Sequence, residues 1–373
     1  MAVRATDDLF PPGEFIRDEL KARNWTQRDL AKILGRPAKS VNHIMSGKTS
    51  ITTKTAQELA AAFETSAELW LNLESAYRLG LERRDQVDVA RRARLYQKAP
   101  ISEMMKRQWI RECDEVEGIE RQVLDFLRIE SLDEVPSLNV AARKSASYED
   151  TTPDEFAWCF RALRIARTIE TQPFESGRFL AGLERLRRLT AAREDIREVP
   201  RLLAELGVRF LIVERLPRMR LDGVTLWIDG ASPVVAMSLR YDRLDWFWFT
   251  LSHELSHVKH GDGLSIDRDL VGTKRQRSED KPEFEQRADR EACEFLVPQA
   301  ELRSFITRVR PLYSRKRIIQ FANLHQVHPG IVVGQLQFRE EMPYSHSRDM
   351  LEAVRHIIID SAVTDGWGYL PAA

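Results

Sequence analysis

Cysteine is scarce in this chain of 373 residues. Cys113, Cys159 and Cys293 are scattered, and no two of them form a Cys-x-x-Cys pair. The chain therefore offers no framework for disulfide bonds and no thiolate zinc site, and its cysteine usage fits the reducing cytoplasm.

Long apolar runs are absent as well. The longest run, near Trp246, is far too short to span a bilayer. The N-terminal stretch carries Arg4, Asp7 and Asp8 where a signal peptide would have an apolar core. We therefore expect a cytoplasmic protein that has no membrane partner.

Neither sign of charge is in excess, because 57 Lys and Arg residues balance 57 Asp and Glu residues. A uniformly basic coat for nucleic acid and an acidic tail are both excluded, so any contact with DNA must come from a local patch. The length is sufficient for two or three domains with cores of their own.

What the chain does contain is the sequence His-Glu-Leu-Ser-His at residues 253–257. Two histidines four residues apart project from one face of a helix and can share one zinc ion. Glu254 can then act as the general base toward a water molecule at the metal. Helical spacing of apolar side chains supports a half-buried helix here, at Trp248, Leu251, Leu255 and Val258. The alternative is a helix that holds no metal.

A zinc hydrolase site needs a third protein ligand. A second predicted helix, from Pro282 to Leu296, places Glu285 and Asp289 one turn apart. Glu285 is the favoured ligand, and Asp289 can hydrogen-bond the far nitrogen of a ligand histidine and fix its orientation. His260, near the same face as His257, is the rival third ligand. No motif identifies a side chain that would stabilise an oxyanion; Tyr313, His325 and His328 are candidates by residue type alone.

The segment Phe249–Val258, the run Glu285-Gln286-Arg287-Ala288-Asp289 and the ending Cys293–Pro298 resemble the ImmA/IrrE metallopeptidase family. Ser256 stands where that family frequently has glycine. The resemblance covers about residues 202–310. It implies a Zn²⁺ cofactor held by His253, His257 and Glu285, with Glu254 as the catalytic base.

Near the N-terminus, two short helical patterns are joined by a turn through Arg36-Pro37. The first is capped by Thr26 and ends at Gly35, and the second begins at Ala38. Apolar residues suited to the internal contacts of a helix-turn-helix are Leu30, Ala31, Leu34, Val41 and Ile44.

The second of these helices is expected to read DNA. The positions facing outward, suited to base edges in the major groove, are Ala38, Lys39, Ser40, Asn42 and His43. Positions expected to contact phosphates are Gln27, Lys48 and Thr49. Such modules usually bind palindromic operators as dimers, so we expect a homodimer. The alternative is a helix-turn-helix used for protein contacts alone.

Residues 9–80 resemble the Cro/lambda-repressor type of helix-turn-helix. Pro12-Gly13-Glu14, Ser46-Gly47-Lys48 and the stretch Phe63–Leu73 are similar, more narrowly, to HigA-family antitoxins. The resemblance implies a cognate toxin as partner and autoregulation of an operon.

Between these motifs the predicted secondary structure changes from helices to strands. Helical patterns continue to residue 199, and short β-branched or aliphatic runs then follow at 208–216, 224–229 and 234–239, as in antiparallel strands. Near the C-terminus, Phe321-Ala322 and Val332 align with Leu30-Ala31 and Val41 at a common offset. This predicts a second helix-turn-helix-like unit, for which a structural or substrate-positioning role is favoured over DNA binding.

The expected fold is therefore multidomain and mainly α, with one small α+β domain. We expect a five-helix, lambda-repressor-like domain at 9–80, a helical linker or middle region at 81–199, a zincin-like metallopeptidase domain at 200–310 and a C-terminal helical segment at 311–373.

Three functional hypotheses follow. The first is an antitoxin-type regulator fused to a zinc endopeptidase that cleaves a regulatory or partner protein. The second is a non-enzymatic antitoxin-repressor, in which the metallopeptidase-like domain serves for sensing or for partner binding. The third is a protease whose helix-turn-helix only docks a repressor substrate.

Overall fold

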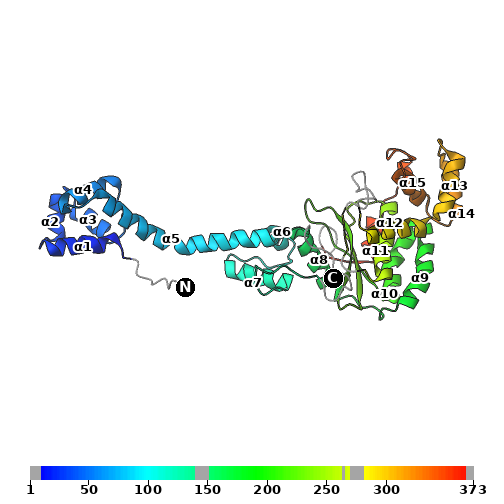
Figure 1. Cartoon of the computed structure of the whole chain (residues 1–373), viewed down its shortest axis with the longest axis horizontal. Coiled ribbons are helices and arrows are strands. Elements are labelled where there is room, and N and C mark those ends of the chain that lie inside the picture. Colours follow the sequence, from blue (N-terminus) through cyan, green and yellow to red (C-terminus); the bar gives the residue numbers. More distant parts are fainter. Residues whose placement is uncertain (1–9, 139–150, 263–264, 269–280, 367–373) are drawn as a thin grey trace. The chain divides into compact units, whose positions relative to one another are not determined.

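The computed structural model describes residues 10–138, 151–262, 265–268 and 281–366. The chain divides into two compact units, residues 1–93 and 94–373. The multidomain and mainly helical architecture expected from the sequence is confirmed (Figure 1).

The first unit consists of helices α1 (Pro12–Ala22), α2 (Gln27–Ile33), α3 (Ala38–Met45) and α4 (Thr53–Phe63), together with the start of α5 (Ala67–Lys98). Its five-helix arrangement agrees with the prediction. Helix α2 begins with a capping box in which Thr26 and Asp29 bind each other's backbone N–H. One buried side of each helix forms the core, which includes Ile16, Leu30, Val41, Leu59, Phe63 and Trp70.

Gly13 is required by the packing of α1 on α3. A Cβ atom at this position would overlap with the backbone carbonyl of Met45. The glycine thus lets the first turn of α1 approach the end of the predicted recognition helix.

The second unit is built on a mixed sheet of five described strands in the order β4-β2-β3-β1-β5. These are β1 (Arg209–Ile212), β2 (Leu221–Trp227), β3 (Pro233–Met237), β4 (Ser265–Arg268) and β5 (Val363–Thr364). The hairpin β2–β3 is antiparallel, as expected, but β1 runs parallel to both β3 and β5. The expectation of an antiparallel sheet was therefore wrong for β1. The reason is that the chain crosses from β1 to the far side of β3 before forming β2, so β3 returns in the direction of β1.

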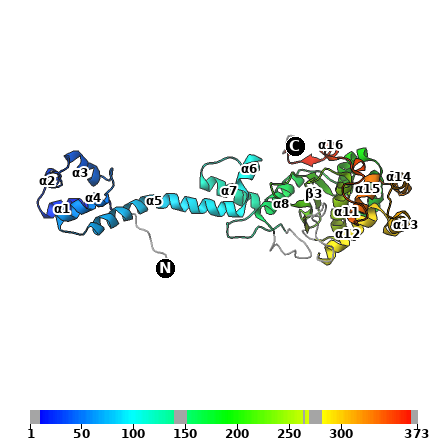
Figure 2. The same ribbon diagram turned by 90° about the horizontal axis from the view of Figure 1, so that it is seen from above.

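Both faces of this sheet are buried by helices. Along β1, Phe210 and Ile212 pack in the core beneath α11 (Leu244–His260), whereas Leu211 packs in the core beneath α8 (Pro153–Ala166). The two helices lie on opposite sides of β3 in Figure 2. A strand covered on both faces can be apolar at consecutive positions, which explains the buried apolar run at 234–237 in β3.

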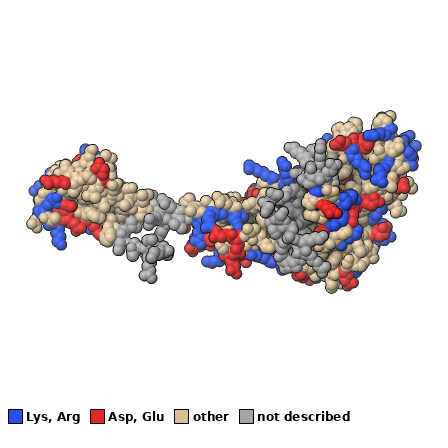
Figure 3. All heavy atoms as spheres, viewed as in Figure 1, with Lys and Arg blue, Asp and Glu red and all other residues tan. Residues whose placement is uncertain are grey.

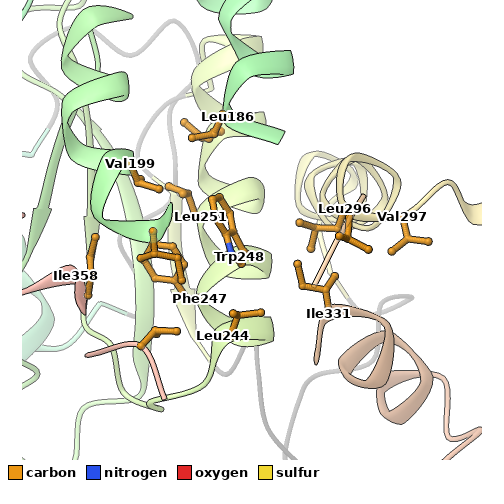
Figure 4. Close-up of a cluster of buried hydrophobic side chains, with 14 of the residues drawn as sticks. Leu186, Val199, Leu244, Phe247, Trp248, Leu251, Leu296, Val297, Ile331 and Ile358 are labelled. Atoms are coloured by element: carbon orange, nitrogen blue, oxygen red, sulfur yellow. The ribbon is translucent and has the colours of Figure 1, made fainter. Parts of the chain in front are cut away.

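The core that holds α11 is assembled from distant parts of the chain. It includes α9 (Ser176–Arg188), α10 (Val199–Glu205), α12 (Glu283–Leu296) and α15 (Pro329–Phe338). Figure 4 shows part of it around Phe247, Trp248 and Leu251 of α11. The remaining described helices of the unit are α6 (Ile101–Lys106), α7 (Val116–Leu127), α13 (Gln299–Val309), α14 (Arg315–Leu324), α16 (Arg355–Ile358) and short 3₁₀ turns at Leu189–Ala191, Arg193–Glu198 and Arg348–Met350.

The compact units differ from the four segments expected from the sequence. Helix α8, from the expected middle region, covers the sheet, and Arg107 donates to the backbone carbonyls of Glu214 and Arg215 over 2.7 and 2.8 Å. The C-terminal segment adds strand β5 to the same sheet. The stretches 94–199 and 311–373 thus belong to the unit that contains the His-Glu-Leu-Ser-His sequence.

Helices α14 and α15 form the pair expected to resemble a helix-turn-helix. Four residues connect them, as four residues connect α2 to α3, and Gln326 takes a positive φ where the first pair has Gly35. However, most of α15 is buried, and it packs against α11. Because a recognition helix must be exposed, this burial favours a structural role for the pair.

Lys and Arg side chains are interspersed with Asp and Glu on both units in Figure 3, in keeping with the net charge of zero. Within the described ranges, no helix is both long enough and apolar enough to cross a membrane.

Candidate metal centre

Helix α11 carries the two histidines into the interior. Its apolar side chains anchor it against the sheet and α9, and it ends at Gly261, which has a left-handed φ of 60°. His253 and His257 are both fully buried. This burial is unusual for histidine and requires that each ring nitrogen have a specific role.

The side chains of His253, His257 and Glu285 come together between α11 and α12. The two Nε2 atoms lie 3.1 Å apart, and Glu285 Oε2 lies 3.0 Å from Nε2 of His253. Glu285 Oε1 is 3.6 Å from Nε2 of His257. All three residues offer one ligand atom within 4.8 Å of the others.

The outer nitrogen of each histidine faces an aspartate. Asp289 Oδ1 lies 3.0 Å from Nδ1 of His253, and Asp262 Oδ2 lies 3.0 Å from Nδ1 of His257. An ionised carboxylate only accepts hydrogen bonds, so a neutral ring that donates to it from Nδ1 presents the lone pair of its Nε2 to the centre. Three electron-pair donors therefore face one another.

This donor set fits a zinc ion. Tetrahedral Zn²⁺ with nitrogen and oxygen ligands at its usual bond lengths separates neighbouring ligand atoms by about 3.3 Å. The separation of the two Nε2 atoms, 3.1 Å, and that of His253 Nε2 from Glu285 Oε2, 3.0 Å, lie near that value, and one ligand atom from each of the three residues lies within 4.8 Å of the others. Two imidazoles and one carboxylate also match the ligand types of hydrolytic zinc sites.

The two aspartates are held ionised. Burial alone would raise the pKa of Asp289, but hydrogen bonds and charge attraction from His253 and Lys281 outweigh it and lower the pKa. The pKa of Asp262 is likewise lowered, since hydrogen bonds from His257 and Arg287 outweigh its burial. Both carboxylates can therefore orient the rings as charged acceptors.

Each aspartate also has a cationic partner of its own. Lys281 Nζ donates to Oδ2 of Asp289 over 2.8 Å, and Arg287 pairs with Oδ2 of Asp262. On each side of the centre, a cationic side chain therefore pairs with an aspartate, and that aspartate faces a histidine ring.

Glu254 is fully buried between α11 and β2. Thr225 Oγ1 lies 2.7 Å from its carboxylate oxygen Oε2 and 3.0 Å from its backbone carbonyl. Its other oxygen, Oε1, lies beside Gly223, where a Cβ atom would overlap with it. The strand thus determines where this carboxylate lies.

The other candidates named from the sequence lie elsewhere. His260 is exposed at the end of α11, with Nε2 2.8 Å from Glu291 Oε1. Tyr313 donates to Glu341, His325 packs against Phe321 with the two rings tilted by 55°, and His328 caps α15 by accepting from the Gly330 N–H. None of these side chains belongs to the group formed by the two buried histidines and Glu285.

Sequence reasoning missed the contributions of Asp262, Thr225 and Gly223. Asp262 directly follows Gly261, which ends α11, and this Gly-Asp pair is the sequence signal that could have identified it. Nothing local marks Thr225 or Gly223, because their relation to Glu254 depends on how β2 is placed against α11.

In the first unit, the residues predicted to read DNA lie on and around α3. Ala38, Lys39 and Asn42 are exposed, Ser40 and His43 are half-buried, and Lys48 and Thr49 are exposed after the helix ends. Gln27 opens α2, and its Nε2 lies 3.1 Å from the Met45 sulfur at the end of α3. Val41, Ile44 and Met45 point inward and hold the helix.

Comparison with known proteins gives independent findings. Residues 16–70 match the family model described as helix-turn-helix, and residues 204–334 match the one described as IrrE N-terminal-like domain. The uncharacterized HTH-type transcriptional regulator YddM of Escherichia coli (strain K12) is 31% identical over 84 residues, which are 22% of this chain and 88% of that protein.

Solved structures are also similar in sequence. An addiction module antidote protein of a HigA family from Coxiella burnetii is 38% identical, over 20% of this chain and 84% of that chain, with a TM-score of 0.20. Pseudomonas aeruginosa antitoxin HigA, solved with the higBA promoter, is 33% identical over 21% of this chain and 89% of that chain, with a TM-score of 0.21.

Proposed function

Because the chain belongs to the helix-turn-helix family of transcriptional regulators and also carries an IrrE N-terminal-like domain, we propose that it is an operator-binding zinc endopeptidase that cleaves a regulatory or partner protein. The N-terminal unit supplies DNA binding. The second unit would supply hydrolysis of a peptide bond. Operators of such regulators are usually palindromic, so we expect the active species to be a homodimer.

One observation carries this proposal: two buried histidines and a buried glutamate converge, each histidine oriented from behind by its own aspartate. His253, His257 and Glu285 would hold the zinc, and Asp289 and Asp262 would keep the rings in place. When bound, zinc lowers the pKa of a water molecule and polarises the carbonyl group of a substrate.

Glu254 would move the proton. Its Oε1 would accept a proton from the water molecule that attacks the carbonyl carbon, and would then donate it to the amide nitrogen as the C–N bond breaks. Thr225 would act as a positioning residue, because its hydroxyl group binds the other oxygen of the same carboxylate. Burial of Glu254 excludes bulk water from this proton transfer.

The proposal is tested by incubating the purified full-length protein, loaded with zinc and operator DNA, with the proteins encoded beside it. Wild-type protein and Glu254→Gln are compared by mass spectrometry. We expect a defined cleavage product from the wild type and none from Glu254→Gln, with zinc retained in both. The same product from both proteins would overturn the assignment of Glu254.

A second candidate is the non-enzymatic antitoxin-repressor, with a cognate toxin as partner. It is favoured by the HigA-like signature in the first unit, where Phe63 and Trp70 pack with ring centroids 5.7 Å apart and Trp70 donates to Thr65. In that case the wild type would bind operator and zinc but would yield no product in the same incubation.

A further inference from the structure

A small cavity lies between α9, α11 and α12. Its volume is about 250 Å³, and its lining includes Leu183 of α9, Ser252, Leu255 and Lys259 of α11, and Glu294 and Phe295 of α12. Within the parts of the chain that the structure describes, none of the metal-binding side chains lines it.

The cavity lies against a different face of α11 from the one that carries His253 and His257. Ser252 precedes His253 by one residue, and successive residues of an α-helix point about 100° apart. Ser252, Leu255 and Lys259 follow one another at helical spacing, so they form one stripe along α11. The cavity is thus separate from the candidate metal centre.

Apolar side chains make most of the wall. Leu183, Leu255 and Phe295 come from three different helices and line a space that is partly open to solvent. This space is smaller than the pocket of a typical drug-sized ligand. It suits one ring with a short chain.

The wall also contains a buried hydroxyl group. Ser252 is only 6% exposed, and its Oγ has no hydrogen-bond partner among the described residues. A helical serine usually bonds back to the carbonyl of the preceding turn, but this hydroxyl does not. Because buried polar atoms are almost always paired, Ser252 Oγ points to a ligand atom that accepts or donates a hydrogen bond.

The charged residues at this cavity are not equally available. The carboxylate of Glu291 already lies within hydrogen-bond distance of Ser256 Oγ, Lys259 Nζ and His260 Nε2, at 2.9, 3.1 and 2.8 Å. Glu294 is exposed and makes no ion pair with the described cations; its Oε2 accepts only the backbone N–H of Gln299. Lys259 is therefore already paired with Glu291, whereas the Glu294 carboxylate can still pair with a cation.

We propose that this cavity binds a small aromatic amine with a hydroxyl group at the end opposite its ammonium group. The ring would lie between Leu183, Leu255 and Phe295. The hydroxyl group would bond Ser252 Oγ, and the ammonium group would pair with Glu294. This proposal does not depend on peptidase activity, because none of these residues is assigned to the metal centre.

The test is calorimetric titration of the full-length, zinc-loaded protein with tyramine. Two comparison ligands each change one end: 2-phenylethylamine lacks the hydroxyl group, and 4-hydroxyphenylacetate has a carboxylate in place of the terminal aminomethyl group. We expect about one tyramine per chain, weaker binding of 2-phenylethylamine by about 5- to 10-fold, and no measurable binding of 4-hydroxyphenylacetate.

Variants locate the site. Ser252→Ala should bind tyramine and 2-phenylethylamine equally, Glu294→Gln should weaken tyramine about 5- to 10-fold, and Leu183→Trp should fill the cavity and abolish binding. If Leu183→Trp disturbs the fold, Ser252→Ala and Glu294→Gln still decide the question. The proposal is overturned if tyramine does not bind, if the three variants bind it like the wild type, or if 4-hydroxyphenylacetate binds equally well.

Discussion

The hydroxyl group of Thr225 donates a hydrogen bond of 2.7 Å to the carboxylate oxygen Oε2 of Glu254. Two residues earlier on the same strand, Gly223 leaves the space that the other carboxylate oxygen uses. Strand β2 therefore positions the side chain that we propose as the base, although it lies far from that residue in the sequence.

Gly223→Ala should displace the Glu254 carboxylate, because the new methyl group would also stand 2.9 Å from Thr250 Cγ2. A displacement of about 1 Å can lower a catalytic rate about 100-fold. We expect cleavage to fall by that order while zinc content, measured by elemental analysis, is unchanged. Gly177→Ala is the matched control, since nothing lies within 4 Å of its Cβ position. Full activity in Gly223→Ala would contradict the role given to β2.

Asp289→Asn and Asp262→Asn should each weaken zinc binding. Both substitutions remove the charge that orients a histidine ring, and loss of such a partner typically costs about 10- to 100-fold in metal affinity. Competition with a chelator gives the dissociation constants. Glu283→Gln, an exposed change in the first turn of α12, should leave them unaltered. If the Asp variants behave like this control, the aspartates do not support the centre.

Much of the centre could be predicted because its information is local. The spacing of His253 and His257 on one helix, and of Glu285 and Asp289 on the next, follows from helical periodicity alone. What periodicity does not specify is which strand lies against a helix. Gly223 and Thr225 meet Glu254 only because β2 pairs with β3 and packs beneath α11.

The sheet shows the same limit. Apolar runs in the sequence identified strands near β1, β2 and β3. When both faces of a strand are buried, parallel and antiparallel neighbours give the same run of apolar residues, so the runs do not reveal the direction of a strand. Strand β5 has only two residues, Val363 and Thr364, and joins β1 across a long sequence distance. Pairings of that kind depend on the whole fold.

The double substitution Lys39→Ala with Ser40→Ala should weaken operator binding and reduce discrimination between operator and unrelated DNA. Both residues begin α3, where side chains enter the major groove in this fold. Lys48→Ala should instead weaken binding to all DNA about equally and reduce the salt dependence by about one unit of slope. Fluorescence anisotropy at several salt concentrations separates the two effects. Unchanged operator affinity in the double variant would argue that α3 does not read bases.

His328 should make the second unit less stable in acid. Its Nδ1 must be unprotonated to accept from the Gly330 N–H, and burial lowers the pKa of His328 below its ordinary value of 6.5. The unfolded chain therefore takes up this proton more readily than the folded one. The stabilising contribution is complete above pH 6.5 and is lost as the pH falls through that value toward the folded pKa.

His328→Asn tests this contribution, because asparagine is a good helix cap and does not titrate. Urea unfolding at pH 8 should give nearly equal stabilities for the two proteins. At pH 5 the wild type should have lost more of its stability than the variant. An equal loss in both proteins would show that another group causes the acid sensitivity.

The most direct test of the metal centre is zinc content per chain, measured in the wild type, Glu285→Ala and His260→Ala. These variants separate the buried carboxylate beside both histidines from the exposed imidazole that pairs with Glu291. The proposed centre predicts about one zinc ion per chain in the wild type and in His260→Ala, and loss of zinc in Glu285→Ala. Zinc retained in Glu285→Ala and lost in His260→Ala would contradict it.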